Sequence, residues 1–462
     1  MGWVLTAVMD MDPEDIRASI RNGALNIGVY GLGWMGLPIA CLFAEAGANV
    51  IGVDVNRYVV ETVNGGRSHV EEPELQKLLK KDVKAKRLVA TDNVGEAAFK
   101  SDVIVIVVPT LIDGRKVPDY SAVRKVCKSI GMKLRKGCLV IFESTVRPGT
   151  TEGLVKKTIE GASGLKAGSD FGLAYSPIRA SAGSVLRDVQ SYPRVIAGLS
   201  EDSLKAASAV LSTIIKGKLI EVQDVKMAEA VKLFENVYRD VNIALANELA
   251  IFCERAGIDF EEAKEIANTQ PFSHIHMSSI GVGGHCIPQN PYFLIEEADS
   301  VGAKLALSKA ARKINDEMPK HAVDLVISGL RARRKTLRRA RIAVLGVSYK
   351  ANVKEARASP VHQVVRTLMK KGAKVVVYDP YFSAEEIREM GYDSADDLWQ
   401  AVDSVDCVFF AVAHAKFRSL KIDDIGRFVK KPVILVDGCH ILDFKDVKRE
   451  WVVYREIGRG KV

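Results

Sequence analysis

The stretch LNIGVYGLGWMGLPIA, residues 25–40, decides the fold of the first part of the chain. It predicts a buried strand, then a turn in which Gly31, Gly33 and Gly36 form G-x-G-x-x-G, then an apolar helix. The next predicted strand ends on Asp54. Glycines in this context let the backbone turn tightly and approach a pyrophosphate, and the carboxylate binds a ribose. The unit therefore predicts a dinucleotide site, with a purely structural turn as the alternative. Because an acidic residue repels a 2′-phosphate, NAD is favoured over NADP.

The same pattern continues along the chain and then recurs. Apolar runs predict a doubly wound NAD-binding Rossmann domain over residues 25–222, preceded by an N-terminal extension over residues 1–24. Four strand patterns repeat in the same order within residues 330–462, which predicts a second Rossmann-like domain that can bind some other nucleotide. Of the glycine fingerprint, this second copy keeps only Gly346.

Residues 223–329 separate the two copies and predict a central helical domain. Residues 224–257 contain no Pro or internal Gly, and their apolar spacing predicts one long helix, or two in line, that supplies a homodimer surface. The expected fold is therefore α/β, with two doubly wound domains joined by a long central helix and a helical middle domain.

Composition excludes several functions. The 66 Lys and Arg against 57 Asp and Glu leave a net charge of +9, which suits an acidic ligand but does not indicate nucleic acid. Apolar stretches are of strand length, so no membrane span is expected. The seven cysteines are scattered, which argues against disulfides and a metal site and favours the cytoplasm. The basic run at residues 330–342 is interpreted as a solvated connection, with a polyanion-binding patch as the alternative.

One cysteine and two helical residues are candidates for chemistry. Cys286 follows Gly283 and Gly284 in a glycine-rich loop, where a thiolate can attack a carbonyl; a buried apolar role is the alternative. The other six cysteines are predicted to be core residues. Lys232 and Asn236 are four apart on the long helix, so they share a face and can stabilise an oxyanion, unless they are ordinary surface residues.

These residues lie in motifs that resemble the UDP-glucose/GDP-mannose dehydrogenase family from residue 26 to about residue 438. The motifs are IGVYGLGWMGLPIA, VPT at 108–110, ESTVRPGTT at 143–151, AEAVKLFENVYRDVNIALANE at 228–248, GVGGHCIPQNPYFL at 281–294 and LGVSYKANVKEARASP at 345–360. The His-Cys pair and the following Pro-Tyr-Phe resemble the N-acetylhexosamine branch, which acts on sugars such as UDP-N-acetylmannosamine.

The resemblance implies an NAD-dependent, four-electron oxidation of C6 of a UDP-sugar for polysaccharide biosynthesis. Cys286 would capture the intermediate aldehyde as a thiohemiacetal, a second oxidation would give a thioester, and water would release the uronate. Lys232 and Asn236 would hold the oxyanion and bind substrate. The further residues implied are Thr145 in catalysis and cofactor binding, Thr110 and Arg357 at the cofactor, and Gly283, Gly284, Lys350 and Arg179 at the substrate.

Three positions depart from the family pattern. Asn290 stands where the family has an aspartate, Ile178 replaces a glutamate, and Phe272 appears in place of an arginine. Asparagine and isoleucine cannot take a proton, so His285, His274 or His276 would have to serve as the base, unless they are structural. The alternative function is therefore a binding pseudoenzyme, or an enzyme with two-electron chemistry or a different sugar.

Overall fold

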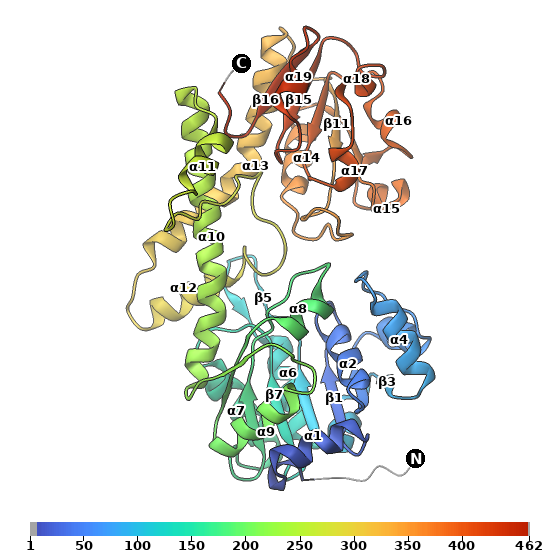
Figure 1. Cartoon of the computed structure of the whole chain (residues 1–462), viewed down its shortest axis with the longest axis vertical. Coiled ribbons are helices and arrows are strands. Elements are labelled where there is room, and N and C mark those ends of the chain that lie inside the picture. The colour runs from blue at the N-terminus through green and yellow to red at the C-terminus, as the bar shows by residue number, and fades with distance from the viewer. Residues whose placement is uncertain (1–6, 461–462) are drawn as a thin grey trace. The chain divides into compact units, whose positions relative to one another are not determined.

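A computed structural model describes residues 7–460, which form two compact units (Figure 1). The first unit comprises the chain up to Glu235 together with Tyr292–Ala303. The second comprises Asn236–Pro291 and the chain from Lys304 onward.

The first unit is built on an eight-stranded sheet with the order β10-β9-β8-β7-β4-β1-β2-β3. All neighbours pair in parallel except β8 and β9. Its strands are β1 (Asn26–Tyr30), β2 (Asn49–Val53), β3 (Leu88–Thr91), β4 (Val103–Ile106), β7 (Leu139–Phe142), β8 (Gly172–Tyr175), β9 (Arg194–Gly198) and β10 (Leu219–Glu221), and β5 (Leu111–Ile112) and β6 (Pro118–Asp119) form a separate small ribbon.

Helices cover both faces of this sheet because its strands are apolar on both sides. Val103 and Val105 of β4 belong to one core, and Ile104 and Ile106 belong to the other. The helical elements are the 3-10 turn Val8–Asp10, α1 (Pro13–Arg21), α2 (Gly36–Glu45), α3 (Arg57–Asn64), α4 (Leu75–Lys84), α5 (Val94–Lys100), α6 (Ser121–Gly131), the π-helical turn Thr151–Val155, α7 (Lys156–Ser163), α8 (Val185–Ser191), α9 (Glu201–Leu211) and α12 (Asn290–Ser300). Helix α1 buries Ile16 and Ile20 in the first of these cores.

The second unit contains a six-stranded parallel sheet with the order β13-β12-β11-β14-β15-β16. Its strands are β11 (Arg341–Leu345), β12 (Lys374–Tyr378), β13 (Asp393–Ser394), β14 (Cys407–Phe410), β15 (Val433–Asp437) and β16 (Val452–Glu456). Its helices are α11 (Phe260–Ala267), α13 (Ala306–Ala332), α14 (Val361–Lys370), α15 (Ala384–Glu389), α16 (Leu398–Val402), α17 (Ala415–Arg418), α18 (Ile422–Ile425) and α19 (Phe444–Val447). The central order β12-β11-β14-β15 repeats β2-β1-β4-β7, which confirms two doubly wound domains.

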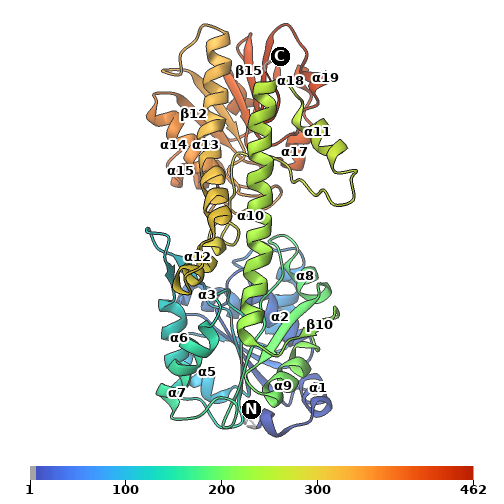
Figure 2. The same ribbon diagram turned by 90° about the vertical axis from the view of Figure 1, so that its left-hand side faces the viewer.

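The long central helix is also confirmed. Helix α10 (Val225–Ala256) is a single uninterrupted helix that begins in the first unit and ends in the second (Figure 2). Among the described residues, no helix is long and apolar enough to cross a membrane. The basic run is only partly a connection, because its first residues complete α13 and its last residues begin β11.

Candidate active site

The turn after β1 needs glycine at two positions. Gly31 has a φ of +98°, and a methyl group on it would stand 2.5 Å from the carbonyl oxygen of Val107. On Gly36 a methyl group would stand 1.7 Å from the carbonyl oxygen of Gly31, so only glycine lets α2 begin this close to the turn. At Gly33 no atom of the described residues lies within 4 Å of the same position. This open space suits the close approach of a pyrophosphate.

Asp54 follows β2 at the edge of this turn. Its Oδ2 accepts a hydrogen bond from the backbone N–H of Leu32 at 3.0 Å, and its Oδ1 accepts one from Asn56 at 2.9 Å. The side chain is half-buried, and each carboxylate oxygen keeps a further lone pair. The carboxylate is therefore held in place and can still accept hydrogen bonds from ribose hydroxyls.

The structure brings Thr110 and Thr145 together. They follow the neighbouring strands β4 and β7, and the hydroxyl of Thr110 donates to the carbonyl oxygen of Thr145 at 2.6 Å. The hydroxyl of Ser144 donates to the carbonyl oxygen of Val108 at 2.7 Å. Because ligands of parallel α/β sheets bind at the carboxyl ends of the strands, both threonines lie where a cofactor pocket is expected.

Arg179 is already bound inside the first unit. Its guanidinium pairs with Glu235 of α10 and donates to the carbonyl oxygen of Pro193 at 2.7 Å. The preceding Ile178 is 8% exposed and belongs to the apolar core. The position of the family's glutamate is thus filled by a core side chain in this protein.

Lys232 and Asn236 lie one turn apart on α10. Lys232 is half-buried, and Asn236 is 5% exposed. Within the described part of the chain, Nδ2 of Asn236 is buried without an acceptor. A buried amide donor without an acceptor is costly, so it indicates a position where a ligand oxygen can bind.

Cys286 lies on an exposed loop of the second unit, whereas Cys41, Cys127, Cys138, Cys253 and Cys407 are buried, as predicted, and Cys439 is half-buried. The glycines before it pack tightly: a methyl group on Gly283 would stand 2.8 Å from Tyr349 Cβ, and Gly284 has a φ of +84°. Close packing and backbone conformation therefore explain why these two positions are glycine, apart from any role in binding the substrate.

Asn290 is close to the cysteine. It begins α12, and its backbone N–H donates to the carbonyl oxygen of Cys286 at 2.8 Å. Its side chain is 4% exposed, and its Nδ2 also has no acceptor among the described residues. At this position, where the resemblance implies an aspartate, the protein presents an amide donor.

The two basic residues predicted after β11 differ in their surroundings. Lys350 is exposed. Arg357 is bound by Glu355, whose two carboxylate oxygens each lie 3.0 Å from its Nε. Burial lowers the pKa of the nearby His285, and the positive charge of Arg357 lowers it further, against the opposing charge of Glu355.

Phe272, His274 and His276 lie on the segment that leads to the cysteine loop. The side chain of Phe272 is 90% exposed. Burial lowers the pKa of His276, and the charge of Arg239 adds to this effect. His274 and His276 are also linked to α10, because Asn242 donates to the carbonyl oxygen of His274 at 2.7 Å and accepts from the N–H of His276 at 2.9 Å.

Two buried carboxylates of the first unit, Glu229 and Glu143, were not predicted from the sequence. Glu229 of α10 accepts hydrogen bonds from Gly149 and Thr151, and burial raises its pKa to about 7. Its spacing was a usable indication, because Glu229, Lys232 and Asn236 recur at three and four residues on one helix face. The buried pair of Glu143 and Arg194, next to Ser144, had no such indication because 51 residues separate its members.

Comparisons with known proteins find three domains of one family in order along the chain. Residues 25–215 match the NAD-binding domain of the UDP-glucose/GDP-mannose dehydrogenase family, residues 226–317 match its central domain, and residues 343–444 match its UDP-binding domain.

Individual relatives cover nearly the full length. The UDP-N-acetyl-D-mannosamine dehydrogenase of Pyrococcus horikoshii is 36% identical over 95% of this chain and 100% of its own. The UDP-N-acetyl-D-glucosamine 6-dehydrogenase of Pseudomonas aeruginosa is 34% identical over 91% of this chain and 97% of its own. A solved structure of the UDP-D-ManNAc dehydrogenase from Pyrococcus horikoshii is 35% identical, covers 95% of this chain and 100% of its own, and superposes with a TM-score of 0.86.

Proposed function

Because this chain belongs to the UDP-glucose/GDP-mannose dehydrogenase family, we propose that it oxidises C6 of a UDP-N-acetylhexosamine such as UDP-N-acetylmannosamine. The enzyme class and the cofactor NAD follow from the family, and the sugar is taken from the relatives. Bound NAD supplies a hydride acceptor. The open space before Gly33 and the carboxylate of Asp54 fit its pyrophosphate and ribose.

In this proposal, Cys286 is the nucleophile. The C6 alcohol loses a hydride and a proton to give an aldehyde, and the thiolate adds to its carbonyl carbon to form the anion of a thiohemiacetal. Loss of a second hydride gives a thioester, and attack by water releases the uronate and restores the thiol. The single observation that carries the proposal is that Cys286 alone among the seven cysteines is exposed, on the glycine-rich loop.

The remaining roles follow the chemistry of each side chain. The ammonium of Lys232 and the acceptor-free amide of Asn236 stabilise a developing oxyanion. Thr110 and Thr145 position the nicotinamide side, and Lys350 binds the substrate phosphates. Arg357 and Arg179 act only if a ligand can compete with Glu355 and Glu235.

The test is a panel of UDP- and GDP-sugars with the NADH formed per sugar as the readout. We expect about two NADH per UDP-N-acetylhexosamine, because alcohol to acid is a four-electron oxidation. Cys286→Ser lowers turnover at least about a thousandfold, while Cys253→Ala, at a buried cysteine of α10, leaves it unchanged. Absence of NADH with every sugar would remove the proposal.

A second candidate is an enzyme that stops early, or a protein that binds both ligands without turnover. It is favoured by Ile178 and Asn290, which remove two carboxylates that could move a proton or orient water. Mass spectrometry after incubation with NAD and the sugar then detects a sugar adduct on Cys286. Asn290→Asp combined with Ile178→Glu shortens the lifetime of that adduct.

We further propose a homodimer formed through α10. Large apolar side chains on this helix are about half exposed and recur at spacings of four and seven residues, which is typical of a helix-packing seam: Met227, Phe234, Tyr238, Leu245 and Phe252. A second copy would bury this stripe. The double variant Phe234→Glu, Phe252→Glu is expected to have the molar mass of a monomer in light scattering, whereas the unaltered protein has that of a dimer.

The cellular setting is also a proposal. All seven cysteines are free, which suits the reducing cytoplasm. The product, a nucleotide-activated uronate, is a suitable donor for a glycosyltransferase that builds a surface polysaccharide.

A further inference from the structure

A tight turn after β15 fixes the direction of a buried histidine. The strand ends on Asp437, whose carboxylate accepts hydrogen bonds from the backbone N–H groups of Cys439 at 3.0 Å, Ile441 at 2.9 Å and Leu442 at 2.8 Å. Within this turn, His440 has a φ of +55°, in the left-handed region. A non-glycine residue rarely adopts this conformation, so the surrounding contacts must hold it there.

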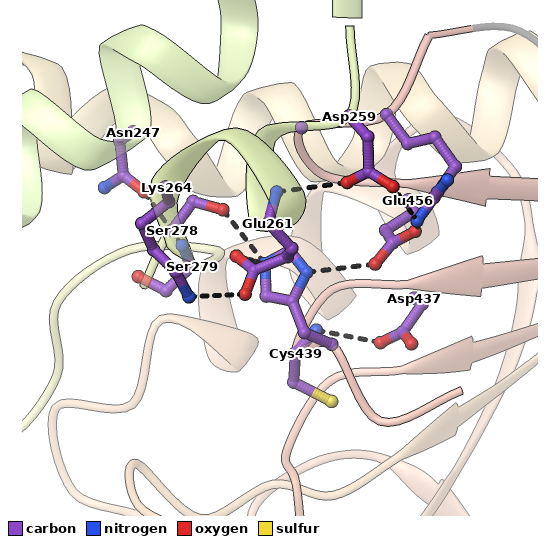
Figure 3. Close-up of polar contacts among 12 residues, drawn as sticks. Asn247, Asp259, Glu261, Lys264, Ser278, Ser279, Asp437, Cys439 and Glu456 are labelled. Carbon is purple, nitrogen blue, oxygen red and sulfur yellow. Dashed lines mark hydrogen bonds and ion pairs between the residues drawn. The ribbon is translucent and has the colours of Figure 1, made fainter. Parts of the chain in front are cut away.

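The imidazole of His440 has an oxygen partner at each nitrogen. Nδ1 lies 3.1 Å from Glu456 Oε1 of β16, and Nε2 lies 2.9 Å from the hydroxyl of Ser278 and 3.8 Å from Glu261 Oε1 of α11 (Figure 3). The side chain is 5% exposed. The Ser278 hydroxyl can accept from Nε2 or donate to it, so both hydrogen bonds can form with either protonation state, and the nearby carboxylates of Glu456 and Glu261 favour the imidazolium.

Carboxylates outnumber cations around the histidine. The charges of Glu261, Asp437 and Glu456 act on the imidazole, and Asp259 belongs to the same network of ion pairs. Two cations accompany them. Arg459 lies 2.6 Å from Asp259 and 2.7 Å from Glu456, and Lys264 lies 2.6 Å from Glu261.

These charges decide the protonation of the histidine. Burial lowers the pKa of His440, but the hydrogen bond to Glu456 and the charges of Glu261 and Asp437 outweigh it, so the pKa is raised above its ordinary value. The imidazolium therefore persists to a higher pH than that of a free histidine.

The same turn holds the start of the cysteine loop. Ser278 stands eight residues before Cys286. Between them, Ile280 is 4% exposed and packs so closely on the turn that a methyl group on Gly438 would stand 2.6 Å from its Cγ2. The N–H of Ser279 donates to Asn247 Oδ1 at 2.8 Å.

The next part of the loop is held by a different segment. The N–H of Gly284 donates to the carbonyl oxygen of Ala358 at 3.3 Å. Residues 278–284, which precede the thiol, are thus held at both ends.

We propose that His440 is a positioning residue, which clamps residues 278–286 to the second sheet and so sets the placement of Cys286. Protonated, it joins β16 to Ser278 through two hydrogen bonds. When it is neutral, Nδ1–H still donates to Glu456 while Nε2 accepts from the Ser278 hydroxyl, but the positive charge that attracts Glu456 and Glu261 is gone, so the contacts weaken and the start of the loop opens more often. The consequence for turnover rests on the proposed function of Cys286, whereas the clamp itself does not.

Hydrogen–deuterium exchange of the full chain tests the clamp without any substrate. After correction for intrinsic rates, protection of the amides in residues 279–290 is expected to fall roughly tenfold as the pH rises from 6 to 9, because the attraction of the imidazolium for Glu456 and Glu261 is lost. His440→Gln shows the low protection already at pH 6 and no pH dependence. The matched control is His321→Gln, which removes a histidine of α13 that contacts Glu254 at 2.8 Å, and it behaves like the unaltered protein.

A milder variant covers the case in which His440→Gln does not fold. Ser278→Ala leaves the pair of His440 and Glu456 intact and is expected to reduce protection of residues 279–290 alone. The proposal would be overturned if amide protection of residues 279–290 did not change with pH in the unaltered protein, or if Ser278→Ala kept full protection.

Kinetics gives an independent readout. With an active sugar, His440→Gln lowers kcat several-fold and removes one limb of its pH profile, while KM is unchanged. If no sugar reduces NAD, the proposed function fails and the exchange experiment still decides the clamp.

Discussion

The two α/β halves make the same turn after their first strand and use it differently. Gly31 and Gly346 have φ values of +98° and +99°, and a carboxylate after the second strand, Asp54 or Asp379, accepts the N–H of the residue that follows each glycine, at 3.0 and 2.8 Å. Asp379 also receives the Ser348 hydroxyl at 3.1 Å and lies 3.0 Å from His414 Nε2, and it is fully buried.

The corresponding positions of the first half leave the carboxylate accessible. Gly33 stands where the second half has Ser348, and Thr110 stands where it has His414, each four residues beyond its strand. Asp54 is only half-buried. Small residues thus leave the carboxylate of Asp54 accessible to a dinucleotide, whereas the corresponding carboxylate of Asp379 is fully engaged inside the second half.

The largest expected effect comes from Gly36→Ala. The added methyl would stand 1.7 Å from the carbonyl oxygen of Gly31, so α2 must move away from the turn. We expect a loss of about 3 kcal/mol in the free energy of unfolding and of at least about a hundredfold in NAD affinity. Urea unfolding and calorimetric titration measure these changes. Gly33→Ala, where the space is open, is the control: it weakens NAD binding without changing stability.

Replacing each of the two carboxylates by an amide tests the difference between the two turns directly. Asp379→Asn is expected to cost about 3 kcal/mol of stability, because it removes the charge from a buried pair, and to leave NAD affinity unchanged. Asp54→Asn is expected to weaken NAD binding by roughly tenfold or more, at a cost below about 1 kcal/mol in stability. Equal stability losses in the two variants would contradict the distinction between the turns.

Much of this comparison could be predicted from sequence. Strands buried on both faces have continuous apolar runs, which is why the order of four strands and its repetition could be found. The glycine turn was visible because its residue types are required by backbone geometry. Partners distant in sequence were not predictable: Arg179 pairs with Glu235, 56 residues away.

The departures of Ile178 and Asn290 were visible only as missing carboxylates. Burial of Ile178 in the apolar core and the acceptor-free Nδ2 of Asn290 depend on the packing around them, so sequence alone could not predict either.

The two halves are also expected to respond oppositely to pH. Burial raises the pKa of Glu229 to about 7, so the folded first half holds a proton that the unfolded chain releases above about 4.5. Its stability therefore falls, by on the order of 2 kcal/mol, as the pH rises from 4.5 through 7. Glu229→Gln should flatten this slope in thermal unfolding followed across that range.

In the second half, burial raises the pKa of Asp379, but the hydrogen bond and charge of His414 and the backbone donors outweigh it, so the pKa is lowered. The stability that Asp379 contributes is present above the unfolded pKa, about 3.9, and is lost as the pH falls through the folded value. Acid is therefore expected to lower the free energy of unfolding of the second half in a pH range where Glu229 is already protonated in both the folded and the unfolded state. An Asp379→Asn protein with an unchanged acid limb would refute this.

The smallest expected difference concerns the corner before each first strand. Gly23 before β1 and Arg339 before β11 both have a left-handed φ, of +77° and +68°, but only the first is glycine. Arg339→Gly is expected to stabilise the second half by about 0.5 kcal/mol, because relief of the strained conformation exceeds the added freedom of the unfolded chain. Gly23→Ala is expected to destabilise the first half by about 1 kcal/mol, since its methyl would also stand 2.3 Å from Arg87 Nη1. Urea midpoints of the two variants should shift in opposite directions, and a shift in the same direction would mean that the corners are not equivalent.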